Sequence, residues 1–194
     1  MATSDIAVFD FDCTLTRTDT LVPWLRELAG IRRVPRGLAN GIGRFLQAGT
    51  DRRTAFKAAL LGRLARGRSV ADGQAAARRL SARVRWRQEQ LDRFAWHKDQ
   101  GHMTVIATGS PRLAVAELVA DHCQPDLLIG TELEVDDAGL LTGRILGGNC
   151  VREEKARRIE GLMQRLGPFG ESFGYGNLPH DRAMLGLMQH RVVV

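Results

Sequence analysis

The stretch "IAVFDFDCTLT" at residues 6–16 places two aspartates, Asp10 and Asp12, directly after four apolar residues. The run Ile6–Phe9 is rich in β-forming residues and predicts a short buried strand. Carboxylates this close repel each other, and they are costly beside apolar side chains. The pair therefore requires compensating groups that other parts of the chain must bring to the end of the first strand.

Strand and helix patterns alternate after Gly101. The segment "MTVIATGSP" predicts a strand and a loop, and Pro111 then opens a helix. Further on we expect a strand and hairpin at 125–145, a helix at 152–166, a strand at "ESFGYGN", a short helix at 181–188 and a last strand at "RVVV". Strands separated by helices predict an α/β fold, a Rossmann-like parallel sheet with right-handed crossovers.

Between Thr20 and about His97 the pattern is helical. Each of the first two helices has one apolar face, formed by Leu38, Ile42, Phe45 and Leu46 in the first and by Phe56, Leu60, Leu61 and Leu64 in the second. Two more helices are expected over 70–85 and 88–99. We therefore predict an α-helical cap domain, residues 17–98, inserted into a core domain made of residues 1–16 and 99–194.

The predicted cap is strongly basic. Residues 17–98 contain 19 Lys and Arg against 6 Asp and Glu, whereas the whole chain carries a net charge of +6. Such a region either faces an anionic ligand or membrane, or consists of Arg-rich helices with solvated faces. No nucleic-acid-binding motif accompanies the charge, so we expect no nucleic-acid partner.

Cysteine usage and hydropathy indicate the compartment. Cys13, Cys123 and Cys150 are odd in number and lack metal-ligand spacing. No apolar run approaches the ~20 residues that span a bilayer, and the N-terminus lacks the pattern of a secretory signal. We expect reduced thiols in a cytoplasmic protein.

Polar side chains follow the predicted strands, where parallel strands of an open α/β sheet form a ligand-binding edge. The residues at this edge are Asp10 and Asp12 after the first strand, Thr108 after "TVIA", Asn177 after "SFGYG", Asp181 four residues later, and Lys155 at the start of a helix. A divalent cation would neutralise the clustered acids, and oxygen ligands in this number suit Mg²⁺.

These motifs, in this order, resemble those of the haloacid dehalogenase (HAD) superfamily of hydrolases, and most closely its subfamily IB, the phosphoserine-phosphatase-like branch. The Asp-x-Asp-x-Thr motif is matched by Asp10, Asp12 and Thr14, and the three later motifs by Thr108, by Lys155 and by the pair Asn177 and Asp181. The resemblance covers nearly the whole chain. It implies a HAD-like core with an inserted cap, and a Mg²⁺-dependent phosphomonoester hydrolase.

The resemblance also implies a role for each matched residue. Asp10 would be the nucleophile that forms an aspartyl-phosphate, and Asp12 the general acid and base. Thr108 would hold phosphoryl oxygens, and Lys155 would offset their charge. The remaining members of the expected site are Thr14, Gly109 and Asp19 for phosphate or substrate, and Asp10, Asp12, Asn177 and Asp181 for the metal.

Four positions need separate interpretation. Asn177 stands where the family usually has Asp, which predicts weaker Mg²⁺ binding. Cys13 stands where Gly is commonest, and we interpret it as a small buried side chain. Asp19 occupies the position of an acid that binds the substrate's amino group in phosphoserine phosphatases, although a helix N-cap is the favoured interpretation. His180 adjoins the last motif, but a surface position is favoured for it.

The substrate stays open at this point. It is either a small phosphoserine-like phosphomonoester or a lipid phosphate such as phosphatidylglycerophosphate, for which the basic cap would contact an anionic membrane. The alternative function is a non-catalytic phospholigand-binding protein on the same scaffold, and Asn177 is the residue that supports it.

Overall fold

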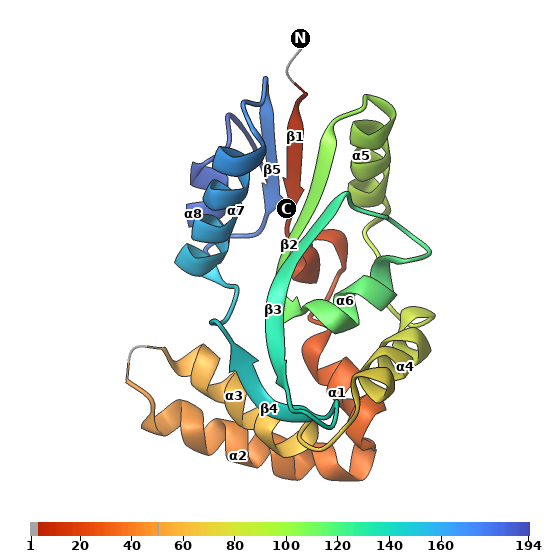
Figure 1. Ribbon diagram of the computed structural model, residues 1–194, viewed down its shortest axis with the longest axis vertical. Coiled ribbons are helices and arrows are strands. Elements are labelled where there is room, and N and C mark those ends of the chain that lie inside the picture. The colour runs from red at the N-terminus through yellow and green to blue at the C-terminus, as the bar shows by residue number, and fades with distance from the viewer. Residues whose placement is uncertain (1–3, 50) are drawn as a thin grey trace.

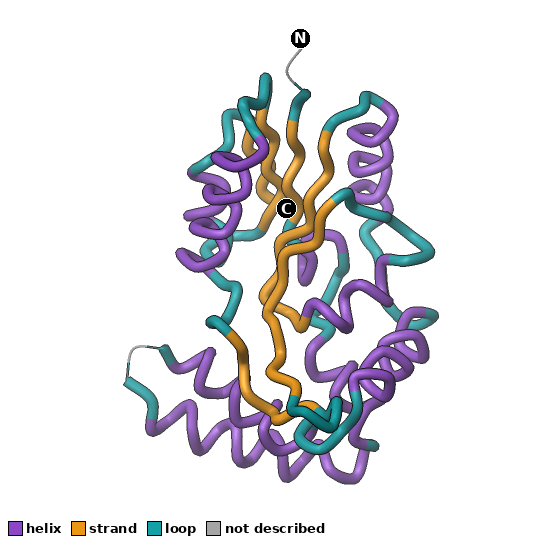
Figure 2. Tube along the Cα trace, viewed as in Figure 1, coloured by secondary structure: helices purple, strands orange, loops and turns teal. Residues whose placement is uncertain are grey.

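The computed structural model describes residues 4–49 and 51–194. Its centre is a sheet in the order β4-β3-β2-β1-β5-β6, in which β4 runs antiparallel to β3 and the other neighbours are parallel. This mixed α/β architecture confirms the predicted fold class (Figures 1 and 2). The strands are β1 (Ile6–Phe9), β2 (Met103–Pro111), β3 (Leu127–Val135), β4 (Leu141–Leu146), β5 (Ser172–Gly176) and β6 (His190–Val193).

Helices fill the long interval between β1 and β2 and cover the sheet. They are α1 (Leu21–Ala29), α2 (Val34–Gln47), α3 (Arg52–Leu64), α4 (Val70–Ser81), α5 (Gln88–Asp99), α6 (Arg112–Val119), α7 (Arg152–Leu166) and α8 (Arg182–Gly186). The helix expected over 70–85 ends at Ser81, because the chain turns there and Trp86 then pairs with Thr16. In the two described ranges, none of the helices combines the length and the apolar character needed to cross a membrane.

The central strand is β1, which pairs in parallel with β2 on one side and with β5 on the other. After β1 the chain adds β2 and β3 on one side, and later crosses over to add β5 and β6 on the other. Such a reversal of strand order opens a crevice at the carboxyl ends of the strands. Asp10 follows β1 directly and therefore lies at this crevice.

Helices pack on both faces of the sheet, so β1 contributes to two cores. Ala7 and Phe9 belong to the core that includes α5 and α6, and Ile6 and Val8 belong to the core that includes α7 and α8. Because side chains alternate across a strand, a strand that is covered on both faces has to be apolar at every position. This explains the uninterrupted apolar run before Asp10.

α2 and α3 pack against each other at the bottom of Figure 1. Gly37 and Gly41 make the contact close, since a Cβ atom on either would lie 2.8 Å from a side-chain atom of Leu64 or of Phe56. Glycines four residues apart lie on one face of a helix, and their missing side chains let the neighbouring helix approach. α3 also packs against β4.

The division into a core of residues 1–16 and 99–194 and a cap of residues 17–98 stays a prediction. The inserted helices do not all share one position in the molecule. α5 packs on the central strands, where the ring of Phe94 lies 5.1 Å from that of Phe9, and α4 packs on α6. α2 and α3 are the inserted helices that lie farthest from these strands in Figure 1.

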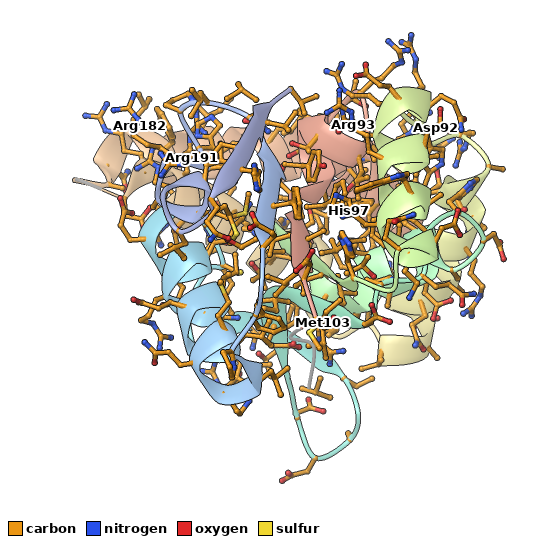
Figure 3. The ribbon with its side chains drawn as sticks, turned by 90° about the horizontal axis from the view of Figure 1, so that it is seen from above. Asp92, Arg93, His97, Met103, Arg182 and Arg191 are labelled. Carbon is orange, nitrogen blue, oxygen red and sulfur yellow. The ribbon has the colours of Figure 1, made fainter. Side chains whose placement is uncertain are left out.

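A buried histidine joins α5 to the sheet. His97 is fully buried, with its Nε2 atom 2.8 Å from the hydroxyl of Tyr175 and its Nδ1 atom 2.8 Å from Nδ1 of His102 (Figure 3). The ring of Tyr175 stacks on that of Phe9 at a centroid distance of 4.2 Å. Burial, reinforced by His102, lowers the pKa of His97 to about 4.

This histidine predicts a pH dependence of stability. Between pH 6.5 and 4 the unfolded chain binds a proton at this position and the folded chain does not, so acidification favours unfolding. We expect His97 to remove up to about 3 kcal/mol from the free energy of unfolding over this window. Urea unfolding from pH 7.5 to 4.5 should show a flatter profile for His97→Phe than for the wild type.

His190 supplies the control for this experiment, since its side chain is 52% exposed. The variant His190→Gln should keep the wild-type slope, because the contact of His190 with Glu171 is exposed and such contacts contribute little to stability. Equal slopes for the wild type and His97→Phe would contradict the assignment of a neutral buried imidazole.

Candidate active site

A buried ammonium lies between two buried carboxylates at the end of β1. Lys155, in the first turn of α7, donates hydrogen bonds to Oδ1 of Asp10 at 2.7 Å and to Oδ1 of Asp181 at 2.6 Å. The side chains are 4%, 6% and 1% exposed respectively. The charge that compensates Asp10 therefore comes from a lysine 145 residues along the chain.

Burial and mutual attraction set the ionisation of this cluster. Burial raises the pKa of Asp10, against the opposing effect of the Lys155 charge. Burial alone lowers the pKa of Lys155, but Asp10 and Asp181 outweigh it and hold that pKa above its usual range. Lys155 is therefore an ammonium at neutral pH.

Asp12 is held by groups on two other segments. The regular strand stops at Phe9, and Asp12 adopts φ −71° and ψ 128° in an irregular turn. Its Oδ1 atom accepts the main-chain N–H and the hydroxyl of Thr20 at 2.8 and 2.7 Å, and its Oδ2 atom accepts the hydroxyl of Ser110 at 2.6 Å. Burial raises the pKa of Asp12 to about 7, so at neutral pH this carboxyl can both give and take a proton.

The turn between the two aspartates and Thr14 passes through a left-handed residue. Cys13 has φ 64°, a conformation that glycine adopts most easily. This accounts for the glycine that is common at the position. The thiol is partly exposed and lines the cavity described below, so our interpretation of Cys13 as a buried side chain is corrected.

Asn177 follows β5 and faces both aspartates. Its main-chain N–H donates to Oδ2 of Asp181 at 2.9 Å. Its side-chain nitrogen lies 3.3 Å from Oδ2 of Asp10 and 3.2 Å from the carbonyl oxygen of Asp12. Thr14 donates its hydroxyl to the same Oδ2 atom of Asp10 at 2.8 Å. The first and last predicted motifs therefore meet at Asp10.

The oxygen atoms of this cluster suit a hard cation, and few of them carry a charge. Oδ2 of Asp10 and the carbonyl oxygen of Asp12 both face the side-chain amide of Asn177, which can present its oxygen or its nitrogen. Both carboxylate oxygens of Asp181 already accept protein N–H groups. Within the described residues no three His, Cys, Asp or Glu side chains are grouped to hold a metal ion, so a cation here depends on the carbonyl and the amide.

The irregular end of β2, residues 108–110, where the pairing with β3 shifts register, is called the active-site loop below; it presents Gly109 and Ser110 to the cavity, whereas Thr108 does not line it. The buried hydroxyl oxygen of Thr108 accepts the N–H of Ser110 at 2.9 Å. Among residues 4–49 and 51–194, no acceptor takes the hydroxyl proton of Thr108, although its side chain is fully buried.

A cavity of about 730 Å³ opens at these groups. Asp19 lines it and also accepts the N–H of Leu21, the first residue of α1, at 2.9 Å; the N-cap itself is Thr20, so the expected cap lies one residue further along. His180 lines it too, with Nε2 2.8 Å from a guanidinium nitrogen of Arg53, and burial together with this charge lowers the pKa of His180. The interpretation of His180 as a plain surface residue therefore misses its position at the cavity.

Sequence reasoning missed several residues of the site, notably Thr20, Ser110, Arg53 and Lys57. Lys57 is 7% exposed and lies on the buried face of α3 with Leu60, Leu61 and Leu64. These positions have the i, i+3, i+4, i+7 spacing of a helix face that packs inward. A lysine within such an apolar row was the signal that could have identified it.

Comparison with known proteins assigns the fold to a family. The sequence model of the haloacid dehalogenase-like hydrolases matches residues 7–186. The chain is also similar to Protein CicA of Caulobacter vibrioides, with 30% identity over 197 residues that cover 96% of this chain and 84% of that protein.

Solved structures share the same fold. A protein with unknown function from Bordetella pertussis Tohama I superposes with a TM-score of 0.82 at 23% identity, over 99% of this chain and 90% of that one. A phosphoserine phosphatase with bound substrate superposes with a TM-score of 0.67 at 16% identity, over 100% of this chain and 87% of that one.

The buried ion cluster predicts a strong effect of removing its cation. Lys155→Met leaves the buried Asp10 and Asp181 without a compensating cation, which should lower the free energy of unfolding by about 3–5 kcal/mol at pH 8. The loss should be smaller at pH 5, because burial, no longer opposed by the Lys155 charge, raises the pKa of Asp10 and favours its neutral form as the pH falls. Urea unfolding at the two pH values measures both.

Lys98 is the matched control, since it forms an ion pair with Asp126 in which the two side chains are 39% and 41% exposed. Lys98→Met should change the stability by less than about 1 kcal/mol. If Lys155→Met were as mild as this control, the cluster would not hold the carboxylates in the way described.

Proposed function

The chain belongs to the haloacid dehalogenase-like hydrolases, and on this premise we propose that it is a phosphatase that hydrolyses phosphomonoesters through an aspartyl-phosphate on Asp10. The observation that carries the proposal is the pairing of a lysine-compensated carboxylate, Asp10, with a second carboxyl of pKa about 7, Asp12, at one cavity. The first group is suited to attack phosphorus and the second to move a proton.

In the first half of the reaction a carboxylate oxygen of Asp10 bonds to phosphorus, and the bond from phosphorus to the ester oxygen breaks. The departing oxygen takes the proton of Asp12, so the product is an alcohol. Lys155 offsets the charge around the nucleophile, and the hydroxyl proton of Thr108 is available to a phosphoryl oxygen.

In the second half the ionised Asp12 accepts a proton from water as the water oxygen attacks phosphorus. The bond between phosphorus and Asp10 breaks, phosphate leaves, and both carboxyl groups regain their starting states. Thr20 and Ser110 hold the two oxygens of Asp12, which keeps the carboxyl oriented for both transfers.

Mg²⁺ is the cofactor that we propose for this site. Asp10, the carbonyl of Asp12 and the side-chain oxygen of Asn177 would hold it, and when bound it supplies positive charge near the phosphoryl group. Asp181 positions Lys155 and the main chain of Asn177 through its two oxygens.

The cavity favours a substrate larger than phosphoserine. Its volume of about 730 Å³ is in the upper range of small-molecule sites. Val22, Pro23 and Phe56 give it an apolar wall, and Arg53 and Arg152 add positive charge. A phosphomonoester with an apolar portion and a further anionic group, such as a lipid phosphate, has the matching chemistry.

The outer surface of α2 supports access to such a substrate in a membrane. Ile42 and Leu46 are 54% and 70% exposed, and Arg36 and Arg44 are exposed on the same helix. Exposed apolar and basic side chains together are typical of helices that rest on anionic lipid surfaces. We include this peripheral contact in the proposal.

The first experiment is phosphate release from a panel of phosphoserine, sugar phosphates and phosphatidylglycerophosphate in vesicles, with Mg²⁺ and with a chelator. We expect Mg²⁺-dependent release, with the lipid phosphate preferred. Asp10→Asn should lower turnover at least about 10³-fold, because an amide is a poor nucleophile. The exposed Asp137 provides the control variant Asp137→Asn, which should keep full activity.

Phosphate binding by the wild type without turnover of any substrate would favour the alternative, a non-catalytic phospholigand-binding protein. Turnover that persists in Asp10→Asn would exclude the proposed nucleophile. A preference for phosphoserine over the lipid would contradict the inference that the apolar wall selects a lipid phosphate. It would not affect the proposed aspartyl-phosphate mechanism.

The uncharged side chain of Asn177 predicts that the site binds Mg²⁺ with measurably reduced affinity. Asn177→Asp restores a negative charge to the oxygen ligands, so half-saturation should occur at a Mg²⁺ concentration lower by about tenfold. The measurement is a Mg²⁺ titration of activity together with calorimetric Mg²⁺ binding. An unchanged Mg²⁺ affinity would place the cation away from Asn177.

A further inference from the structure

A buried lysine connects the inserted helix α3 to the active-site loop at the irregular end of β2. The ammonium of Lys57 donates to Oδ1 of Asn149 at 2.7 Å, to the hydroxyl oxygen of Thr131 at 3.3 Å, and to the carbonyl oxygen of Gly109. Asn149 in turn donates its side-chain N–H to the hydroxyl of Thr54 at 2.8 Å. We call these five residues the clasp.

The hydrogen bonds of the Lys57 ammonium and of the Gly109 carbonyl form a complete set. The three N–H groups of Lys57 have three acceptors. The hydroxyl of Thr131 accepts from Lys57 and from the N–H of Cys150, and donates to the carbonyl of Gly109 at 2.6 Å. The carbonyl of Gly109 thus receives two donors, which fill its two lone pairs. A network this complete is rigid and specifies one arrangement.

The chemistry of the clasp is unusual for a structural contact. Lys57 is 7% exposed, yet its three acceptors are uncharged oxygen atoms. Burial lowers the pKa of Lys57 to about 8, while the charges of Asp12 and Asp19 oppose the shift. A buried ammonium without a contacting carboxylate reduces stability, whereas an apolar residue would continue the row of leucines on α3.

The atom that the clasp holds belongs to the active-site loop. The carbonyl of Gly109 and the N–H of Ser110 form one planar peptide and point in opposite directions. With the carbonyl fixed by Lys57 and Thr131, the N–H is directed to the hydroxyl of Thr108. Ser110 then reaches Oδ2 of Asp12 with its own hydroxyl.

From this geometry we propose that Lys57 is a positioning residue that sets the Thr108–Ser110 loop through the Gly109 carbonyl, and does so only while α3 is docked on Asn149. The inserted helix thereby controls both the entrance of the cavity and the arrangement of the groups that hold the phosphoryl oxygens and Asp12. The expected effect on kcat rests on the proposed phosphatase activity. The expected effect on the structure of the active-site loop does not depend on it.

The test compares Lys57→Met with Arg63→Met in the full-length protein. Both replace a cation on α3 by methionine, but Arg63 is exposed and lies outside the clasp. For Lys57→Met we expect kcat to fall 10- to 100-fold with KM changed less than about threefold, because the loop is misplaced and the cavity wall is kept. Arg63→Met should leave both constants unchanged.

Hydrogen exchange supplies a readout that needs no activity. In Lys57→Met the amides of α3 and of residues 108–110 should exchange at least tenfold faster, whereas those of β1 and β5 should not change. Thr54→Val removes the bond to Asn149 without touching Lys57 or Gly109, and should give a smaller change of the same kind in α3 and in the loop. The double variant with both Lys57→Met and Thr54→Val should show a change in hydrogen exchange smaller than the sum of the changes in the two single variants.

Several results would overturn the proposal. A rise in KM without a fall in kcat would mean that Lys57 contacts the substrate. Faster hydrogen exchange throughout the chain would mean that Lys57 stabilises the whole protein. Faster exchange in α3 without any change in residues 108–110 would disprove the coupling. If the wild type has no phosphatase activity, the proposed function fails while the exchange experiment still decides for or against the clasp.

Discussion

The charge of Asp10 has to be balanced inside the protein, because its carboxylate is buried at the end of the central strand. Lys155 provides this balance by lying between Asp10 and Asp181, and Asp181 also receives the main-chain N–H of Asn177. The ends of β1 and β5 and the start of α7 are therefore joined by one set of charge-assisted hydrogen bonds, which are among the strongest in proteins. The cluster fixes how these three elements meet, and the cavity is formed around it.

The sequence predicts this part of the molecule well, since each charged residue follows directly on a strong strand or helix pattern. Asp10 follows an apolar run and Asn177 follows the strand pattern "SFGYG", and parallel strands bring such positions to one edge. The contacts of Asp12 could not be predicted in the same way. Thr20 and Ser110 reach it from irregular segments, where the backbone path depends on packing rather than on periodicity. Asp19 illustrates the limit, because one carboxylate both accepts the first N–H of α1 and lines the cavity.

Lys57 differs from the arginines of the inserted helices in its chemistry as well as in its burial. A guanidinium is a flat group with donors in a fixed fork, whereas an ammonium is compact and directs three donors from one point. The three oxygens around Lys57 come from three separate segments and surround one nitrogen. Hydrophobic periodicity places this residue inward, but only the assembled fold supplies its acceptors.

The central place of β1 has a consequence for how the protein is made. Ile6 pairs with Met103 on one side and with Ser172 on the other, so β1 is synthesised well before its two partners. Pairing between such distant segments is slow, and an apolar strand with open edges is prone to aggregate until it pairs. The apolar side chains of β1 therefore lack their full packing until β5 has been synthesised. The position that makes Asp10 the centre of the finished site is thus the one that leaves its strand exposed for longest during synthesis.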